Sequence, residues 1–254
     1  RNCMNSCRLF RVMGNKASMT KGTRKAMVFT DKHFILGKPI REVPSGYETA
    51  VFATGCFWGA EKGFWRMPGV HSTAAGYVGG QTQHPTYEET CTGRTGHTEA
   101  VRVVFDPSKI AYSDLLRQFW ECHDPTQVNG QGGDRGTQYR SGVYTTTPVQ
   151  KTLAASSKAA YETALGRQIA TEIGSADSWF YAEDYHQQYL AKPGSRQYCS
   201  AEPTGVALPP FSSWAPKELE GHKPILPEPY WAQHGPKPGC VLRQPHTPIQ
   251  WSNS

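Results

Sequence analysis

The chain has 254 residues, of which 37% are hydrophobic and 19% charged, a composition typical of a globular protein with polar extensions. It contains no run of 18 apolar residues, so the sequence predicts no membrane-spanning helix. The net charge of +6 arises in residues 1–30, which carry seven Lys and Arg and no acid, so the rest of the chain offers no basic face for nucleic acid.

Residues 1–46 are predicted to form a basic leader and a connecting arm. The first 30 residues are rich in Arg and lack a continuous apolar stretch, which resembles an organelle transit peptide more than a secretory signal. Residues 13–18 (MGNKAS) also match the N-myristoylation pattern, which applies if translation begins at Met13. A disordered basic arm is the third interpretation. The compartment stays open between cytoplasm, mitochondrion and plastid.

Residues 47–210 alternate predicted strands and helices. Apolar or alternating runs bounded by Gly and Pro indicate strands, and apolar residues at helical spacing indicate helices. In chain order we expect a strand over 50–53, a helix over 57–66, strands over 70–78 and 99–105, a helix over 113–122, a loop over 124–138, a strand over 140–146, a helix over 148–165, a strand over 169–173 and a helix over 182–190. This order predicts an α/β (α+β) fold, a two-layer sandwich with a mixed sheet and a ferredoxin-like βαββαβ core.

The composition changes after Thr204. Ten prolines fall between Pro209 and Pro248, a density that disfavours helices and strands. Residues 211–254 are therefore predicted to form a long, irregular Pro-rich tail without a core of its own, which either wraps the domain or stays mobile.

Seven cysteines are present, at positions 3, 7, 56, 91, 122, 199 and 240. None forms a C-x-x-C pair, so a four-cysteine zinc site is not expected. An odd number spread over the whole chain also fits a secreted disulfide scaffold poorly. These features favour a reducing compartment in which one or two thiols are reactive.

Cys56 lies between the first predicted strand and the first predicted helix. At such a turn, unpaired backbone N–H groups and the positive end of the helix dipole point at the sulfur and stabilise the thiolate, which is the nucleophilic form. Gly55 allows the chain to turn sharply. The residue pattern alone supports a reactive thiol and a buried structural cysteine about equally.

Residues 55–61 (GCFWGAE) resemble the active-site signature of the peptide methionine sulfoxide reductase A family. Further segments resemble the same family in its order: 75–80 (AGYVGG), 85–87 (PTY), 95–101 (TGHTEAV), 134–141 (DRGTQYRS) and 181–189 (YAEDYHQQY). The resemblance covers about residues 49–209. It implies that residues 47–210 are the catalytic domain of an oxidoreductase that repairs proteins under oxidative stress, reducing peptide-bound and free methionine sulfoxide to methionine.

The resemblance implies a role for four side chains at the sulfoxide. Cys56 is the nucleophile, and Glu99 is the acid that protonates the sulfoxide oxygen during attack. Tyr87 and Tyr139 match the family's two hydroxyl donors to that oxygen. Because Glu99 can donate only while protonated, we expect it in a site where water is scarce.

The resemblance also describes the substrate pocket. Phe57 and Trp58 match the hydrophobic cage around the substrate's methyl group, and Asp134 matches a polar residue that orders the pocket. Family membership implies the S epimer of the sulfoxide. We interpret His97 and His186 as structural hydrogen-bonding residues.

Regeneration is implied to use a second thiol. Methionine release leaves Cys56 as a sulfenic acid, and Cys199 aligns with the resolving cysteine that converts it to a Cys56–Cys199 disulfide. The family's further recycling cysteine would fall at Ala207. Thioredoxin then either attacks the disulfide directly, which we favour, or acts through Cys240 in the tail.

The resemblance implies no metal and no bound cofactor. The expected partners are thioredoxin, as the reductant, and oxidised proteins and peptides that contain methionine sulfoxide. We expect a monomer.

Two other classes compete with this interpretation. A cysteine hydrolase or acyltransferase needs a histidine base beside the sulfur, and none of the nine histidines lies in a recognisable partner motif. A non-catalytic module that binds methionine-containing peptides would not need Cys56, Glu99 and Cys199 together. The reductase hypothesis itself requires an accessible Cys56 sulfur and a Glu99 carboxyl close to it.

Overall fold

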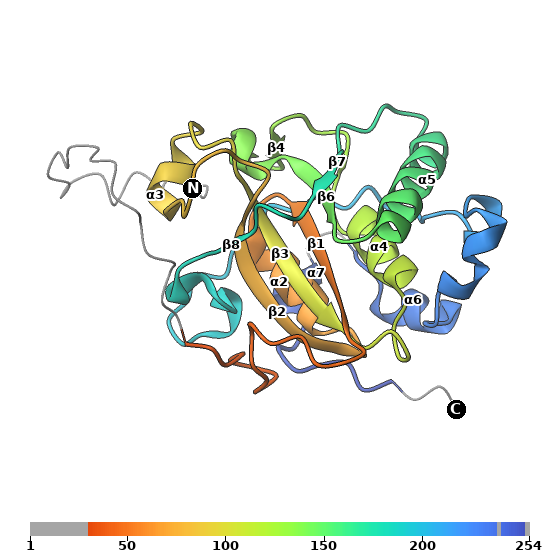
Figure 1. The fold of residues 1–254 in the computed structure, drawn as a ribbon, viewed down its shortest axis with the longest axis horizontal. Helices are drawn as coiled ribbons and strands as arrows, with labels where there is room; N and C mark the ends of the chain where they lie inside the picture. Colours follow the sequence, from red (N-terminus) through yellow and green to blue (C-terminus); the bar gives the residue numbers. More distant parts are fainter. Residues whose placement is uncertain (1–29, 238–239, 252–254) are drawn as a thin grey trace, which may run out of the picture.

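The computed structural model describes residues 30–237 and 240–251, with no side-chain description for Cys240. A six-stranded sheet lies at the centre in the order β7-β6-β1-β3-β2-β8 (Figure 1). Its strands are β1 (Glu48–Thr54), β2 (Val70–Val78), β3 (Thr98–Phe105), β6 (Ser141–Thr145), β7 (Glu172–Ser175) and β8 (Phe180–Tyr181). All neighbours are antiparallel except β6 and β7. The predicted mixed sheet is confirmed.

The main helices are α2 (Phe57–Trp65), α4 (Tyr112–Glu121) and α5 (Pro148–Leu165). The succession β1-α2-β2-β3-α4-β6, with the spatial order β6-β1-β3-β2, is the ferredoxin-like βαββαβ core expected from the sequence. Pro148 fits the first turn of α5, where no N–H is needed, and Gly166 ends that helix in the left-handed conformation.

Alternation along the strands separates the two faces of the sheet. Phe52, Val101 and Val103 point into the main core, where they pack with α2 and α4. Val51 and Tyr144 point to the opposite face, which is covered by Ala176 and Trp179. Cys56 lies on the helical side of the sheet, where β1 leads into α2.

Two predicted elements differ in the structure. The last core strand is Glu172–Ser175 rather than 169–173, because Ile169 N–H donates to the Glu162 carboxylate before pairing with β6 begins. Residues 182–190 form two short 3₁₀ turns, Asp184–His186 and Tyr189–Ala191, instead of a helix. Gln188 between them has φ of +47° and donates its N–H to the Glu61 carboxyl, so it cannot continue a helix.

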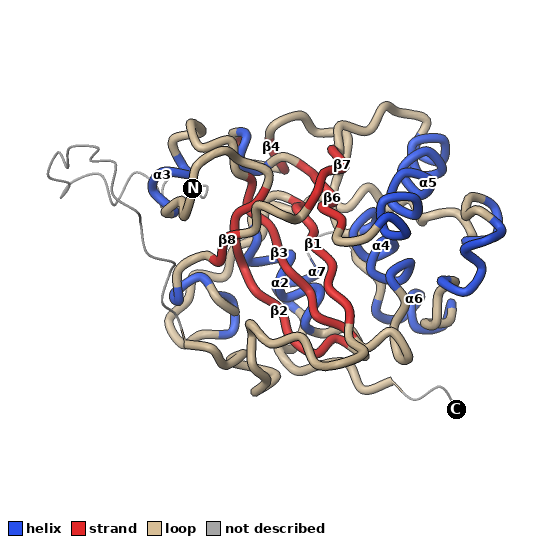
Figure 2. The backbone as a smooth tube through the Cα atoms, viewed as in Figure 1, coloured by secondary structure: helices blue, strands red, loops and turns tan. Residues whose placement is uncertain are grey.

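Several short elements lie outside these predictions. They are α3 (Tyr87–Cys91), a small ladder of β4 (Gly130–Gln131) and β5 (Asp134–Arg135), and in the tail α6 (Glu228–His234) and α7 (Cys240–Arg243). Much of the remaining chain is loop (Figure 2). The sequence signal for α3 was a capping box, in which Thr86 and Glu89 cap each other's backbone N–H groups.

The Pro-rich tail wraps the domain. Apolar side chains between its prolines (Phe211, Leu226, Tyr230 and Trp231) belong to the main core. The buried Asp114 carboxylate of α4 accepts the N–H groups of Ile225 and Leu226 at 2.8 and 3.2 Å. Of the two alternatives left open by the sequence, the described part of the tail shows the packed one.

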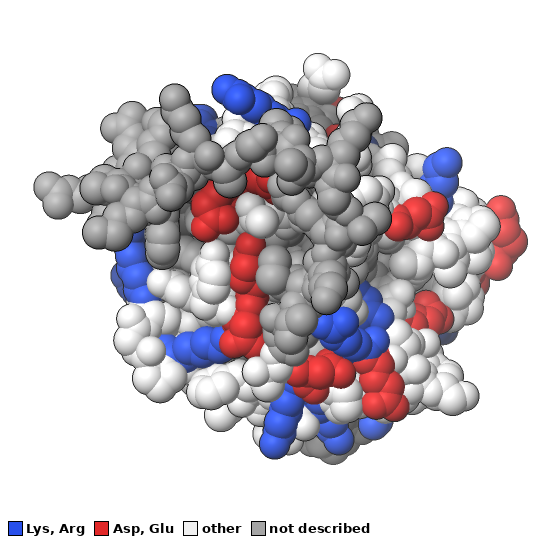
Figure 3. Space-filling view, turned by 60° about the vertical axis from the view of Figure 1, so that its left-hand side comes forward, with Lys and Arg blue, Asp and Glu red and all other residues white. Residues whose placement is uncertain are grey.

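The basic leader and the myristoylation match at residues 13–18 lie outside the described residues. On the face shown in Figure 3, described Lys and Arg side chains are interspersed with Asp and Glu. Within the described residues, none of the helices combines the length and the apolar character needed to cross a bilayer.

Candidate active site

Cys56 is the N-cap residue of α2, as the sequence predicts. Gly55 before it has φ of +93°, a conformation that favours glycine, and a Cβ at this position would lie 2.6 Å from Gln131 Cβ. The turn therefore places the sulfur at the mouth of α2, where backbone N–H groups lack intrahelical acceptors. These dipoles favour a negatively charged sulfur over a neutral one.

Glu99 on β3 meets this turn directly. Its Oε2 accepts a hydrogen bond from Phe57 N–H at 3.1 Å, so the carboxyl lies against the residue that follows Cys56. Glu99 is 1% exposed, and burial raises its pKa well above the usual range of a carboxyl. The Phe57 N–H opposes this rise, and the charges of Asp134 and Glu183 add to it. Glu99 is therefore held protonated, as the predicted acid role demands.

The Cys56 sulfur is less accessible than the reductase hypothesis requires, because the residue is only 4% exposed. The chain around Cys199 runs across the turn. A Cβ at Gly55 would lie 3.6 Å from Ser200 Oγ, and a Cβ at Gly59 would lie 2.3 Å from Cys199 Sγ. The segment that carries Cys199 and Ser200 therefore packs against the turn that carries Cys56.

Aromatic rings pack around the start of α2 and converge on His186. The ring of His186 lies 4.9 Å from Phe57 and 4.5 Å from Tyr87, between centroids. Trp58 Nε1–H donates to His186 Nδ1 at 3.0 Å, and Trp58 stacks on Tyr189 at 3.9 Å. Burial lowers the pKa of His186 to about 3, so the ring is neutral and can accept this bond. The histidine orders the predicted cage, consistent with its structural interpretation.

The predicted oxygen-binding residues lie in the same buried cluster. Tyr87 begins α3, Tyr139 ends a 3₁₀ turn (Thr137–Tyr139), and both share the main core with Cys56. Asp134 on β5 is buried and accepts a hydrogen bond from Tyr198 O–H at 2.9 Å. Tyr198 precedes Cys199, so Asp134 also anchors the chain that carries the second thiol.

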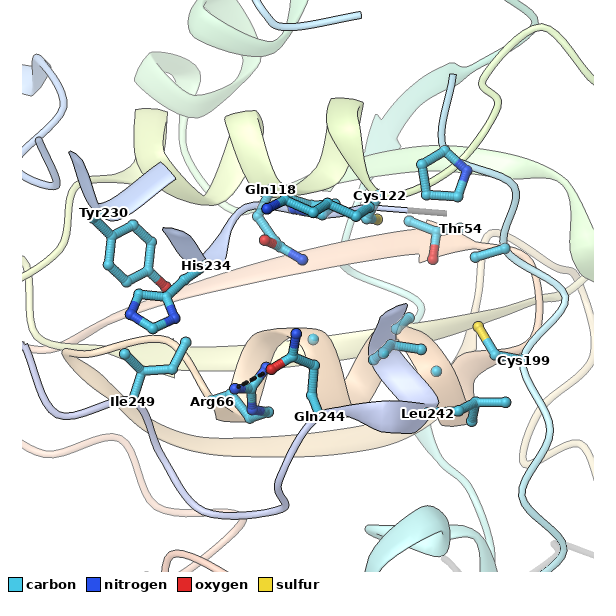
Figure 4. A pocket seen from close by; sticks show the side chains of 18 residues that line it. Thr54, Arg66, Gln118, Cys122, Cys199, Tyr230, His234, Leu242, Gln244 and Ile249 are labelled. Carbon is cyan, nitrogen blue, oxygen red and sulfur yellow. Dashed lines mark hydrogen bonds between the residues drawn. The ribbon is translucent and has the colours of Figure 1, made fainter. Parts of the chain in front are cut away.

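Cys199 is partly exposed and faces a cavity of about 90 Å³ next to the cluster. Figure 4 shows Cys199, Thr54 and Cys122 at one end of this cavity, and Arg66, Gln244 and His234 at the other. Within the described part of the chain, Cys56, Cys122 and Cys199 are reduced and take part in no disulfide. Cys56 does not line the cavity.

Residues 48–208 match the family described as "Peptide methionine sulfoxide reductase". A relative from Synechocystis, named peptide methionine sulfoxide reductase MsrA 1, is 50% identical over 211 residues, which cover 79% of this chain and 95% of the relative. The chain belongs to the peptide methionine sulfoxide reductase family. It is an oxidoreductase that reduces methionine sulfoxide, so the hydrolase and binding-module alternatives are not favoured.

Other members of the reductase family are also similar to this chain, in sequence and in structure. A Rhodospirillum centenum MsrA is 55% identical over 183 residues, covering 70% of this chain and 83% of the relative. The solved structure of methionine sulfoxide reductase A from Corynebacterium diphtheriae has a TM-score of 0.64 and 41% identity, covering 78% of this chain and 97% of that one. The reduced form of Saccharomyces cerevisiae Mxr1 has a TM-score of 0.58 and 31% identity, covering 63% and 93%.

Two residues that shape this reductase site were not predicted. Glu183 accepts Tyr77 O–H and Tyr87 N–H, both at 2.8 Å, and so fixes the start of α3. Tyr198 fixes the approach to Cys199 through Asp134. Their neighbours in sequence (His186 and Cys199) were recognised, but hydrogen bonds between residues 64 to 106 positions apart have no local sequence signal.

Two positions bear on the recycling step, Cys240 and Ala207. Cys240 begins α7, which packs on α2, and its side chain is outside the description. Ala207 lines a second cavity, with Ser113 and Trp214, rather than the one that Cys199 lines.

Proposed function

We propose that this reductase acts on the S epimer of methionine sulfoxide in proteins and peptides, and on the free amino acid, with Cys56 as nucleophile. The Cys56 thiolate attacks the sulfoxide sulfur while Glu99 transfers its proton to the sulfoxide oxygen. The S–O bond then breaks, methionine leaves, and the oxygen stays on Cys56 as a sulfenic acid.

The observation that carries this proposal is the contact of the buried, protonated Glu99 with the backbone beside Cys56. The same turn therefore holds Cys56, whose thiolate form is stabilised, and Glu99, whose protonated form is stabilised. Tyr87 and Tyr139 supply hydroxyl donors to the oxygen, whereas Phe57 and Trp58 hold the methyl group. Asp134 orders the pocket through Tyr198.

The same proposal assigns Cys199 as the resolving thiol. Its sulfur lies beside Gly59, one helical turn from Cys56, and residues so spaced are roughly 5–6 Å apart. A disulfide needs Cβ atoms about 4 Å apart, so a short shift of the 199–202 segment suffices. Condensation of the Cys199 thiol with the sulfenic acid forms the disulfide and releases water.

Thioredoxin is the proposed reductant, and it attacks the Cys56–Cys199 disulfide directly. The separate cavity of Ala207 supports a direct route, because a thiol at that position would not face Cys199. Cys240→Ser is expected to leave thioredoxin-coupled turnover nearly intact. A large loss of that turnover, with dithiothreitol-driven turnover preserved, would establish Cys240 as a relay.

A stereospecific assay tests the assignment of the chemistry. Wild type and Cys56→Ser are each given the two sulfoxide epimers with dithiothreitol, and methionine is quantified. We expect reduction of the S epimer by wild type alone, and a Cys56–Cys199 disulfide by mass spectrometry after one turnover without reductant. Turnover by Cys56→Ser, or a disulfide between other cysteines, would refute the assigned roles.

A further inference from the structure

Glu61 is the last residue of the motif at residues 55–61, and the proposed chemistry gives it no role. It lies on α2 three residues after Trp58 and four after Phe57, so the three side chains share one face of the helix. The Glu61 side chain is fully buried. A carboxyl in this position is stable only when hydrogen-bond donors surround it, so its partners indicate what it holds in place.

Three donors meet the Glu61 carboxyl, and two of them belong to Gln188. Oε2 accepts the backbone N–H of Gln188 at 2.8 Å, and Oε1 accepts the side-chain amide of Gln188 at 2.7 Å. The hydroxyl of Thr73 on β2 donates to Oε1 at 3.0 Å. Hydrogen bonds to an ionised carboxylate are stronger than those between neutral groups, so Glu61 holds Gln188 through both its backbone and its side chain.

The backbone of Gln188 is strained and needs such support. Its φ of +47° lies in the left-handed region, which residues other than Gly, Asn and Asp rarely adopt. The Gln188 Oε1 atom also accepts the N–H of Phe34, from the arm that precedes β1, at 3.1 Å. Strained backbone persists where the surrounding contacts over-determine it, and such positions cluster at functional sites.

The residues on either side of Gln188 hold Trp58. His186 accepts the indole Nε1–H of Trp58 at 3.0 Å, and Tyr189 stacks on the indole with 3.9 Å between ring centroids. His186 lies two residues before Gln188, and Tyr189 directly follows it. The path of the chain at Gln188 therefore determines where both contacts to Trp58 fall.

We infer that Glu61 is a positioning residue that fixes the methyl-binding cage through Gln188, and thereby sets the selectivity of the enzyme for a methyl sulfoxide. The inference rests on the proposed role of Phe57 and Trp58 in holding the methyl group. Glu61 acts through Gln188 and not on the reacting atoms. Loss of its hydrogen bonds should therefore impair the fit of the methyl group more than the chemical step.

Discrimination between two substrates tests the inference. The (S)-sulfoxides of methionine and ethionine differ by one methylene in the group that the cage holds, and a hydrophobic pocket separates such substrates by roughly 10- to 200-fold. The kcat and KM for both are measured with dithiothreitol at pH 8. This pH lies above the raised pKa of Glu61, which is about 7, so the carboxylate that accepts all three donors prevails.

Glu61→Gln preserves the size of the side chain, but either orientation of its amide turns an N–H group toward a donor of Gln188. We expect the preference for the methyl substrate, measured as the ratio of the two kcat/KM values, to fall about fivefold. The KM for methionine (S)-sulfoxide should rise while kcat changes less than about twofold, because Cys56 and Glu99 stay in place. An unchanged preference would overturn the inference.

Asp114→Asn is the matched control. Asp114 is an equally buried carboxyl, on α4, and it also accepts backbone N–H groups, from Ile225 and Leu226 of the tail. Its substitution should lower stability and leave the methyl preference at the wild-type value. An equal fall of the preference in this variant would show that any weakened buried carboxyl has this effect, and would contradict the inference.

Gln188→Gly tests the same path if Glu61→Gln does not fold. Glycine adopts a φ of +47° without strain and keeps the backbone N–H for Glu61, so only the side-chain bonds are lost. The methyl preference should fall about threefold in this variant. Glu61→Gln combined with Gln188→Gly should lower it no further than Glu61→Gln alone. An unchanged preference in Gln188→Gly, or additive losses in the double variant, would refute a path through Gln188.

The Trp58 indole reports on the cage without turnover. Its Nε1–H resonance, assigned in NMR spectra with Trp58→Phe, should exchange with deuterium about tenfold faster in Glu61→Gln than in wild type, because its acceptor His186 is displaced. Equal exchange rates would count against the positioning role. A wild type that does not reduce methionine (S)-sulfoxide would reject the proposed function, whereas an active wild type with unchanged variants would reject only the role of Glu61.

Discussion

Gly59 is the point at which the second thiol meets the active-site helix, so Gly59→Ala tests the resolving role of Cys199. An alanine Cβ at this position would lie 2.3 Å from Cys199 Sγ and 3.1 Å from Cys199 Cβ. Ordinary contacts begin at 3.4 Å, so the sulfur must move by about 1 Å. The substitution leaves Cys56 and Glu99 in place.

A displacement of this size separates the two halves of the reaction. Attack by Cys56 does not involve Cys199, so a single turnover without reductant should still yield one equivalent of methionine. Disulfide formation should slow by roughly 100-fold, because a misplacement of about 1 Å of a reacting group has a cost of that order. Quench-flow with a sulfenic acid trap and mass spectrometry counts the sulfenic acid and the Cys56–Cys199 disulfide over time.

Gly63→Ala is the control, one turn further along α2. A Cβ there meets only Gln118 Nε2, at 3.0 Å, which is the end of a flexible side chain. Both substitutions raise helix propensity by about 1 kcal/mol, so a general effect on α2 is the same in the two variants. Disulfide formation at the wild-type rate in Gly59→Ala, or an equal delay in Gly63→Ala, would refute the reasoning.

Three further predictions concern the acid, a buried carboxyl and the tail. Glu99→Gln should lower turnover by about 10²- to 10⁴-fold, the usual contribution of a general acid. The rate of wild type should fall as the pH rises through the raised pKa of Glu99, and the variant should lose this fall. An unchanged pH–rate profile would show that Glu99 does not transfer the proton. Burial raises the pKa of Glu61 to about 7, against about 4.3 in an unfolded chain. The native state therefore binds the proton at a higher pH than the unfolded state does. Wild type should gain stability relative to Glu61→Gln as the pH falls from about 7 to about 4.5. Urea unfolding at both ends of this window measures the difference, and the opposite sign would show that Glu61 is ionised in the native state. Trp231→Ala should cost about 3–5 kcal/mol of unfolding free energy in urea, since the ring is 4% exposed and lies under the Arg117 guanidinium at 4.6 Å; a loss below about 1 kcal/mol would mean that the tail contributes little to the core.

The fold was predictable where local pattern and tertiary packing agree. Glycine and proline mark the ends of β1, α2 and β2, and their apolar residues follow the period of the element that forms. The tail shows the opposite case. Its prolines suppress regular structure, but they do not prevent Leu226 and Trp231 from packing on α4, and no periodicity reveals which isolated apolar residues will be buried.

The residues of the site were likewise predictable where their signal is local in the sequence, and not where it depends on tertiary contacts. Cys56 was placed correctly because consecutive residues predict the strand-to-helix turn. The family motifs predicted that Glu99 lies close to this turn. The role of Glu183 depends on bonds to Tyr77 and Tyr87 that only the folded sheet creates. The burial of Cys56 was also missed, because the residues that pack against its neighbours Gly55 and Gly59 (Gln131, Cys199 and Ser200) come from distant segments.

This burial determines the route by which reducing equivalents enter. Cys56 is 4% exposed, and the protonated Glu99 carboxyl bonds the backbone of the next residue, so this site suits a small sulfoxide group better than a bulky reductant. Cys199 has the complementary properties: it touches α2 at Gly59, and it also faces a cavity that the tail closes. A reductant that attacks Cys199 releases Cys56 at the helix mouth, where its negative charge is best stabilised. The asymmetry between the two thiols therefore favours attack of the reductant on Cys199.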